Sequence, residues 1–204
     1  MSSITNIRIV GVGGQGILLA SSLLSEALLH SGHDVKTTEI HGMAQRGGSV
    51  FTDVRFGPRV YSPLIPEGSV DILVALELLE AGRHVGSLRE DGTALISKQS
   101  IPPLAVALGA ADYPDDLIDR IGAVVRAVEV IDALDLARKA GNVRTANTVV
   151  LGALSRHLEV SPGVWAEALR ARLGARLLEV NLRAFELGRA GDAGRDSQGE
   201  PVTS

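Results

Sequence analysis

The chain has 204 residues, of which 45% are hydrophobic, so it can bury the core of a layered domain. Its formal net charge of −4 argues against a nucleic-acid binder, which would need a basic face. The absence of cysteine excludes disulfides, thiolate nucleophiles and cysteine-ligated iron–sulfur clusters on this chain.

The N-terminal residues lack the basic and apolar regions of a signal peptide. The most apolar run, residues 10–29, is interrupted by glycine, glutamine, serine and glutamate, whereas a membrane-spanning helix needs about 20 predominantly apolar residues. We therefore expect a cytoplasmic protein without a membrane segment.

The first elements read as a strand, a tight glycine turn and a helix. Residues 7–10 form the strand, and residues 17–30 contain no glycine or proline and predict a helix. Between them the G-x-G-x-x-G pattern lets backbone N–H groups approach a phosphate and lets the helix pack close to the strand. The candidate residues of this turn are Gly11, Gly13, Gly14, Gln15 and Gly16. The glycines could equally serve packing alone, whereas the Gln15 amide could bind an anion or the backbone of a partner.

A second strand, residues 35–38, is followed by Glu39, at the place where a dinucleotide site holds the ribose hydroxyls. A solvated strand end is the alternative reading of Glu39. The polar loop that follows should return to the same edge of the sheet, and loops of this composition are more often sites than spacers. Its candidate residues are His41, Gln45, Arg46, Gly47 and Gly48. Arg46 could present its guanidinium fork to a carboxylate or phosphate, or could pair with Glu39 or a partner chain. His41 could be only a structural hydrogen-bonding residue.

Strands and helices alternate along the rest of the chain, as an α/β layered domain requires. A hairpin is predicted from residues 49–56 through the Gly57-Pro58 turn to residues 60–62. Further strands are predicted at 70–76, 93–97 and 123–129, helices at 77–85 and 131–140, and an irregular segment at 100–114.

From residue 144 onward the sequence predicts helices. They cover residues 145–158, a segment that starts at Ser161 and Pro162, and residues 177–187, whereas residues 189–204 should form a flexible tail. The predicted fold is therefore α/β: a three-layer Rossmann-like sheet, mostly parallel with a hairpin, plus C-terminal helices. We expect one domain over residues 1–188, with residues 144–188 as its helical part.

Four motifs in order, at residues 11–16, 42–50, 147–154 and 181–188, resemble the gamma-type subunit of thiamine-diphosphate-dependent 2-oxoacid:ferredoxin oxidoreductases. The resemblance covers roughly residues 5–190. The segment Gly42-Met43-Ala44-Gln45-Arg46-Gly47-Gly48-Ser49-Val50 is most similar to the beta subunit of the indolepyruvate branch. The pyruvate and 2-oxoglutarate branches usually lack Met-Ala-Gln before Arg-Gly-Gly, and this difference is the basis for the assignment.

The resemblance implies that this chain carries no cofactor. Thiamine diphosphate, magnesium and the iron–sulfur clusters would lie on a larger partner subunit, which would pass electrons to ferredoxin, in a complex with two copies of each chain. The assembled enzyme would convert indolepyruvate or another aryl pyruvate, with coenzyme A as co-substrate, to the aryl-acetyl-CoA. This chain alone should be inactive, in keeping with a sequence in which no nucleophile–base–orienter set can be assembled.

The candidate residues above, together with Asn147 near a helix start, would then face substrate, coenzyme A or the partner, although Asn147 could simply cap its helix. Two other interpretations stay open. One is an NAD(P)-binding Rossmann oxidoreductase module, supported by the glycine pattern and Glu39. The other is a purely structural assembly subunit whose loops contact only a partner.

Overall fold

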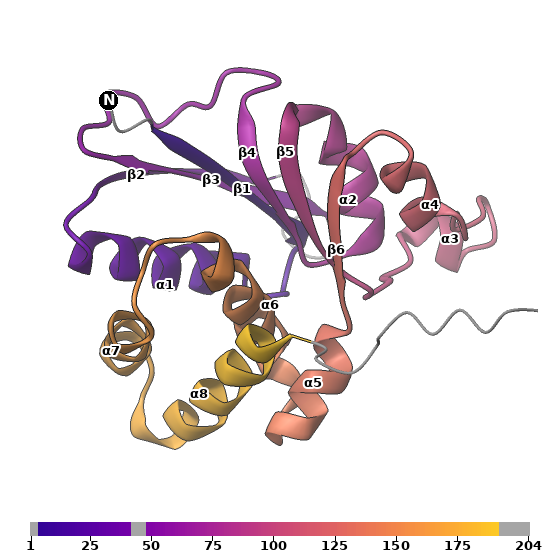
Figure 1. Cartoon of the computed structure of the whole chain (residues 1–204). Helices are drawn as coiled ribbons and strands as arrows, with labels where there is room; N and C mark the ends of the chain where they lie inside the picture. Colours follow the sequence, from indigo (N-terminus) through magenta and orange to yellow (C-terminus); the bar gives the residue numbers. More distant parts are fainter. Residues whose placement is uncertain (1–3, 42–47, 192–204) are drawn as a thin grey trace, which may run out of the picture.

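A single six-stranded sheet forms the middle layer of the computed structural model, which describes residues 4–41 and 48–191 (Figure 1). The strands lie in the order β2-β3-β1-β4-β5-β6. All pairs are parallel except those of β3, which runs antiparallel to both β1 and β2. The strands are β1 (Thr5–Val12), β2 (Asp34–His41), β3 (Ser49–Gly57), β4 (Val70–Ala75), β5 (Leu88–Ser97) and β6 (Ala127–Ile131).

Helices cover both faces of the sheet (Figure 1). The α-helices are α1 (Ile17–His30), α2 (Leu78–His84), α3 (Leu104–Ala107), α4 (Leu117–Gly122), α5 (Ala133–Ala140), α6 (Ala146–Leu154), α7 (Pro162–Arg172) and α8 (Ala175–Ala190). Short 3-10 turns, η1 (Val85–Ser87), η2 (Val143–Thr145) and η3 (Ser155–His157), join some of them. None of the helices in the described segments is long and apolar enough to cross a bilayer.

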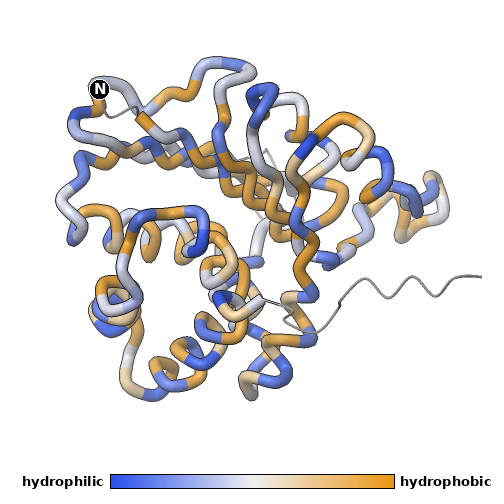
Figure 2. Tube along the Cα trace, in the orientation of Figure 1, coloured by the Kyte–Doolittle hydropathy of each residue, from blue (hydrophilic) through white to orange (hydrophobic). Residues whose placement is uncertain are grey.

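The alternation of side chains along β1 divides the core between the two faces of the sheet. Ile7 and Ile9 are fully buried against α1 and the C-terminal helices, whereas Val10 belongs to a smaller cluster under α2 and α4. Hydrophobic residues dominate the central strands (Figure 2), as expected for strands covered on both sides. This three-layer α/β arrangement, with its mostly parallel sheet and C-terminal helices, confirms the predicted fold class.

The predicted hairpin is wrong in its partner strand. β3 pairs with the preceding β2, with His41 opposite Val50, and not with residues 60–62, which form no strand. Because β3 also pairs with β1 along its whole length, from Thr5 opposite Phe56 to Val12 opposite Ser49, it separates β1 from β2. A plain Rossmann unit would instead place the second strand directly beside the first.

Smaller differences concern element boundaries. β5 begins at Leu88, five residues before the predicted start at residue 93, and its register against β4 shifts between Val70 and Ile72. The strand predicted at 123–129 lies later, as β6, and the short helix α4 precedes it. Both elements are short, so local composition gave little periodicity to distinguish them.

The C-terminal helices begin and end close to the predicted positions. Ser161 caps α7, with its hydroxyl accepting from the Val164 amide, and Pro162 occupies the first turn as expected. α8 extends to Ala190, two residues into the predicted tail, whose remainder from residue 192 lies outside the described residues. α6 and α8 cross closely because Gly152 of one and Gly188 of the other lie against the opposite backbone.

Candidate functional site

The glycine turn connects the carboxyl end of β1 to the start of α1. Gly14 and Gly16 have left-handed φ angles of 105° and 78°, a conformation that side chains other than glycine rarely adopt. Gly16 is the N-cap of α1, and no side chain caps this helix end. The predicted strand–turn–helix unit therefore exists, with the uncapped end of α1 at the turn.

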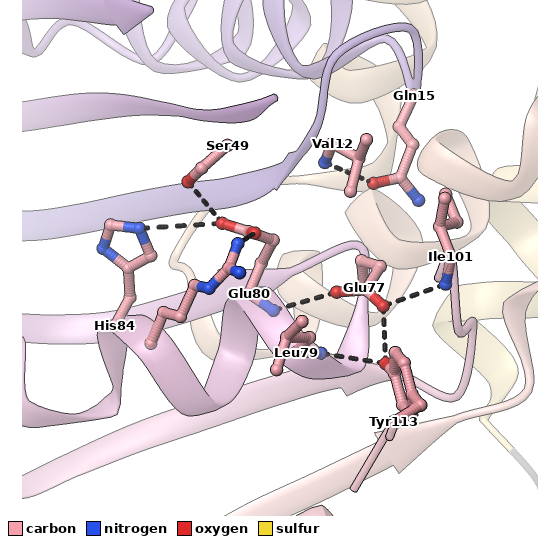
Figure 3. A network of polar contacts seen from close by, with 10 residues as sticks. Val12, Gln15, Ser49, Glu77, Leu79, Glu80, His84, Ile101 and Tyr113 are labelled. Atoms are coloured by element: carbon pink, nitrogen blue, oxygen red, sulfur yellow. Dashed lines mark hydrogen bonds and ion pairs between the residues drawn. The ribbon is translucent and has the colours of Figure 1, made fainter. Parts of the chain in front are cut away.

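Gln15 fastens this turn to the neighbouring strands. Its Oε1 accepts from the Val12 amide at 2.7 Å, and its Nε2 donates to the Leu76 carbonyl at 2.8 Å and to Gln99 Oε1 at 3.0 Å (Figure 3 shows the Val12 contact). Gly11 makes room for this fold-back, because a Cβ there would lie 2.7 Å from Gln15 Oε1. The Gln15 side-chain amide thus makes three hydrogen bonds within the chain, and the residue also lines the cavity described below.

Asn147 closes the turn from the opposite side. Its Nδ2 donates to the Gly16 carbonyl at 3.3 Å, and its Oδ1 accepts from the Thr148 amide. Thr148 in turn donates to Asn181 of α8, so two motifs far apart in the sequence form one buried polar network. Asn147 is not a helix cap, since Thr145 occupies the N-cap position of α6.

A cavity of about 620 Å³ lies beside the turn, at the carboxyl edge of β1, β4 and β5. Ligands of open α/β sheets usually bind at this edge. Gln99 and Ile101 form one wall and Asn147 another. Arg144 also lines the cavity and is exposed, and within the described ranges its guanidinium makes no ion pair or hydrogen bond.

The second predicted loop returns to the same edge, as far as the structure describes it. The Gly13 amide donates to the Gly48 carbonyl at 3.0 Å, which joins the two glycine-rich segments. Gln45, Arg46 and Gly47 lie outside the described residues, and of His41 only the backbone pairing with Val50 is described.

Glu39 does not join this site. It is exposed on β2, pairs across the sheet with Thr52, and lines a separate groove with Ser22, Ser25 and Arg172. The physical reason is the insertion of β3, which moves the end of β2 one strand farther from the glycine turn. The ribose-binding position expected of Glu39 is therefore not formed.

Two buried carboxylates beside the site, Glu77 and Glu80, were not predicted as site residues from the sequence (Figure 3). Glu77, two residues after the end of β4, is fully buried and caps α2 by accepting from the Glu80 amide. Glu80 accepts from the Ser49 hydroxyl at the start of β3 and from Arg83, and its other neighbour is His84. An acidic residue at the end of a buried strand was the signal that could have indicated Glu77.

His84 faces a mixed electrostatic environment. Burial lowers its pKa most, and the Arg8 guanidinium lowers the pKa further, against the opposing effect of Glu80. Arg8 itself forms a two-bond ion pair with Asp53, at 2.7 and 2.8 Å. No group of three or more histidine, aspartate or glutamate side chains that could hold a metal occurs in the segments described.

Comparison with solved structures defines the class of this fold. The gamma subunit of a keto/oxoacid ferredoxin oxidoreductase from Geobacter sulfurreducens superposes with a TM-score of 0.69 at 22% identity, over 93% of this chain and 96% of that chain. A 2-oxoglutarate:ferredoxin oxidoreductase from Magnetococcus marinus, solved with 2-oxoglutarate, coenzyme A and succinyl-CoA bound, matches 92% of this chain and 30% of its own, with a TM-score of 0.73 at 22% identity.

Sequence comparison assigns the family. The indolepyruvate oxidoreductase subunit IorB of Thermococcus kodakarensis is 41% identical over 190 residues, which cover 90% of this chain and 93% of that protein. The sequence model of the pyruvate ferredoxin/flavodoxin oxidoreductase family matches residues 6–191 of this chain. The chain belongs to this family, which confirms the resemblance seen in its four motifs.

Proposed function

We propose that this chain is the gamma-type subunit of an indolepyruvate:ferredoxin oxidoreductase and that its cavity beside the glycine turn receives a phosphate-bearing part of coenzyme A. The supporting observation is the uncapped N-terminus of α1, which meets the cavity through a turn that is nearly free of side chains. Backbone N–H groups at such a helix end favour an anion. The exposed guanidinium of Arg144 adds a positive charge to the same cavity.

The chemistry of decarboxylation belongs to a larger partner subunit in this proposal. That subunit would hold thiamine diphosphate, magnesium and the iron–sulfur clusters, and would pass the electrons released from the oxoacid to ferredoxin. A sequence without cysteine cannot ligate such a cluster by thiolates, so this chain contributes binding surface and orientation. The 41% identity to a protein named as an indolepyruvate oxidoreductase subunit supports the aryl-pyruvate branch.

The NAD(P) interpretation has weaker support. It requires an acidic residue beside the glycine turn, and Glu39 faces another groove on the far side of β3. Titration of the isolated chain with NADH, followed by fluorescence, separates the two interpretations: saturable binding would favour the dinucleotide module.

The coenzyme A proposal is tested in the complex co-expressed with the thiamine-dependent subunit. Replacing Arg144 by alanine should raise the KM for coenzyme A about tenfold, because a charge-assisted hydrogen bond is lost, and should leave the KM for indolepyruvate unchanged. The matched control is Arg170→Ala, which removes an exposed arginine from α7. Equal KM values for coenzyme A in both variants would contradict the proposal.

We also propose, from the sequence alone, that Arg46 binds coenzyme A or the oxoacid. Replacing it by lysine keeps the charge and loses the planar fork, so we expect weaker use of coenzyme A or the oxoacid by an assembled complex. A purely structural role predicts instead that Arg46→Ala prevents assembly, which size-exclusion chromatography of the co-expressed chains measures. An unchanged kcat/KM for both substrates in Arg46→Lys would remove Arg46 from the site.

A further inference from the structure

Glu77 and Tyr113 form a hydrogen-bonded pair behind one wall of the cavity. The Tyr113 hydroxyl donates to Glu77 Oε1 at 2.6 Å and accepts from the Leu79 amide at 3.1 Å (Figure 3). The same carboxylate accepts from the Ile101 amide at 2.9 Å and, through Oε2, from the Glu80 amide at 2.9 Å. Glu77 is 0% exposed, and no cation among the described residues forms an ion pair with it.

These bonds hold the segment after β5 in place. Ile101, bound by Glu77, lines the cavity, and the Gln99 carbonyl accepts from the Leu78 amide at 2.9 Å. The Gln99 side chain then accepts from Gln15 of the glycine turn. A continuous series of hydrogen bonds therefore runs from Tyr113 through Glu77 and the 99–101 segment to Gln15.

The protonation state of the Tyr113 hydroxyl suits this arrangement. Burial, and next the hydrogen bond to Glu77, raise the pKa of Tyr113 to about 12, so its hydroxyl stays a donor at neutral pH. Two backbone amides and one hydroxyl donate to the Glu77 carboxylate, so its buried oxygens have hydrogen-bond partners within the chain.

We propose that Glu77 and Tyr113 are positioning residues, which fix the Gln99–Ile101 wall of the cavity against the glycine turn. They do not touch the cavity themselves; they act through the backbone of Ile101 and the side chain of Gln99. Only the nature of the cavity's ligand rests on the function proposed above. The positioning role itself depends on hydrogen bonds within this chain.

The first test uses Tyr113→Phe, which removes the hydroxyl and keeps the ring. We expect hydrogen exchange of the Ile101 amide, followed by NMR, to become about tenfold faster, because its acceptor loses the donor that holds it. The Leu95 amide in the middle of β5 should keep its exchange rate, which separates a local effect from a general loss of stability. The matched control is Tyr61→Phe, because Tyr61 is 80% exposed.

An unchanged exchange rate at Ile101, or equal acceleration at Ile101 and Leu95, would overturn the positioning role. Glu77→Gln gives a second measurement, since either orientation of the new amide places an NH₂ group against a backbone N–H. It should accelerate exchange at whichever amide faces the NH₂ group, Ile101 or Glu80, and unchanged exchange at both would contradict the assigned contacts.

Kinetics of the assembled complex separates this inference from the proposed function. Tyr113→Phe should raise the KM for coenzyme A several-fold, with kcat unchanged, whereas Tyr61→Phe should change neither. Faster exchange at Ile101 with an unchanged KM would confirm the positioning role and reject coenzyme A as the cavity's ligand.

Discussion

The side-chain amide of Gln15 donates to the side-chain carbonyl of Gln99 across 84 residues of sequence, at 3.0 Å. With its second bond to the Leu76 carbonyl, this amide connects the ends of β1, β4 and β5. The position of the glycine turn therefore depends on the hydrogen bonds of Gln15 as well as on the left-handed backbone of its glycines.

Replacing Gln15 by glutamate tests this connection. The new carboxylate can still accept from the Val12 amide but faces two oxygen acceptors with no proton to give. We expect the free energy of unfolding, measured with urea at about pH 7.5, to fall by about 2–3 kcal/mol. Lowering the pH should reduce this loss, because facing two acceptors raises the folded-state pKa of the introduced carboxyl, and protonation restores a donor. Gln99→Glu, which retains the acceptor, should cost less; an equal cost would contradict the assigned donor.

Two glycines of the turn offer a matched comparison. Both need a left-handed φ, but a Cβ at Gly14 would meet nothing within 4 Å, whereas at Gly16 it would lie 2.5 Å from Asn147 Nδ2. Gly14→Ala should therefore cost about 1–2 kcal/mol for the backbone alone. Gly16→Ala should cost more, since Asn147 must give up its bonds to Gly16 and Thr148. Equal losses in denaturant unfolding would argue against the close approach of Asn147.

The crossing of α6 and α8 depends on two further glycines. A Cβ at Gly152 would overlap the Phe185 carbonyl oxygen, and one at Gly188 would overlap the Val149 carbonyl oxygen. Alanine at either position should lower the free energy of unfolding by roughly 3 kcal/mol or more, since backbone cannot move aside as a side chain can. The double variant should lose less than the sum, because the first substitution already separates the helices. Gly122→Ala, with open space around the new methyl group, serves as the control.

His84 predicts a pH dependence of stability. Its folded-state pKa is lowered, chiefly by burial and then by Arg8, so the unfolded chain binds its proton first as the pH falls. The stability that His84 contributes is therefore present above the ordinary histidine pKa of about 6.5 and is lost as the pH falls from there toward the lowered pKa. Thermal unfolding of His84→Gln should depend less on pH in this range than that of the wild type. The exposed His30→Gln variant provides the comparison, and an unchanged pH dependence in His84→Gln would contradict the assignment.

Local patterns predicted the parts of the fold that local interactions decide. The helix at residues 17–30 matches α1 at both ends, because it contains no breaker and follows a glycine turn. The hairpin prediction was wrong for the opposite reason: glycine-containing sequence flanks residues 49–56 on both sides, and composition does not say on which side the partner strand lies.

The site was predictable only in part. Its glycines follow from a strand–turn–helix pattern, but the contact of Gly16 with Asn147 spans 131 residues and has no local signature. Tyr113 lies in a segment without regular structure, so neither periodicity nor motif spacing could relate it to Glu77.

The place of β1 in the sheet also has a consequence for the order of folding. Among the strands that the structure describes, β1 comes first in the sequence, yet its two neighbours, β3 and β4, end only at Gly57 and Ala75. During synthesis one backbone edge of β1 therefore has no partner until β4 has been made, whereas β2 can pair as soon as β3 has been made. We therefore expect the β4-facing edge of β1 to stay unpaired longer during synthesis than β2 does, and unpaired strand edges favour premature association.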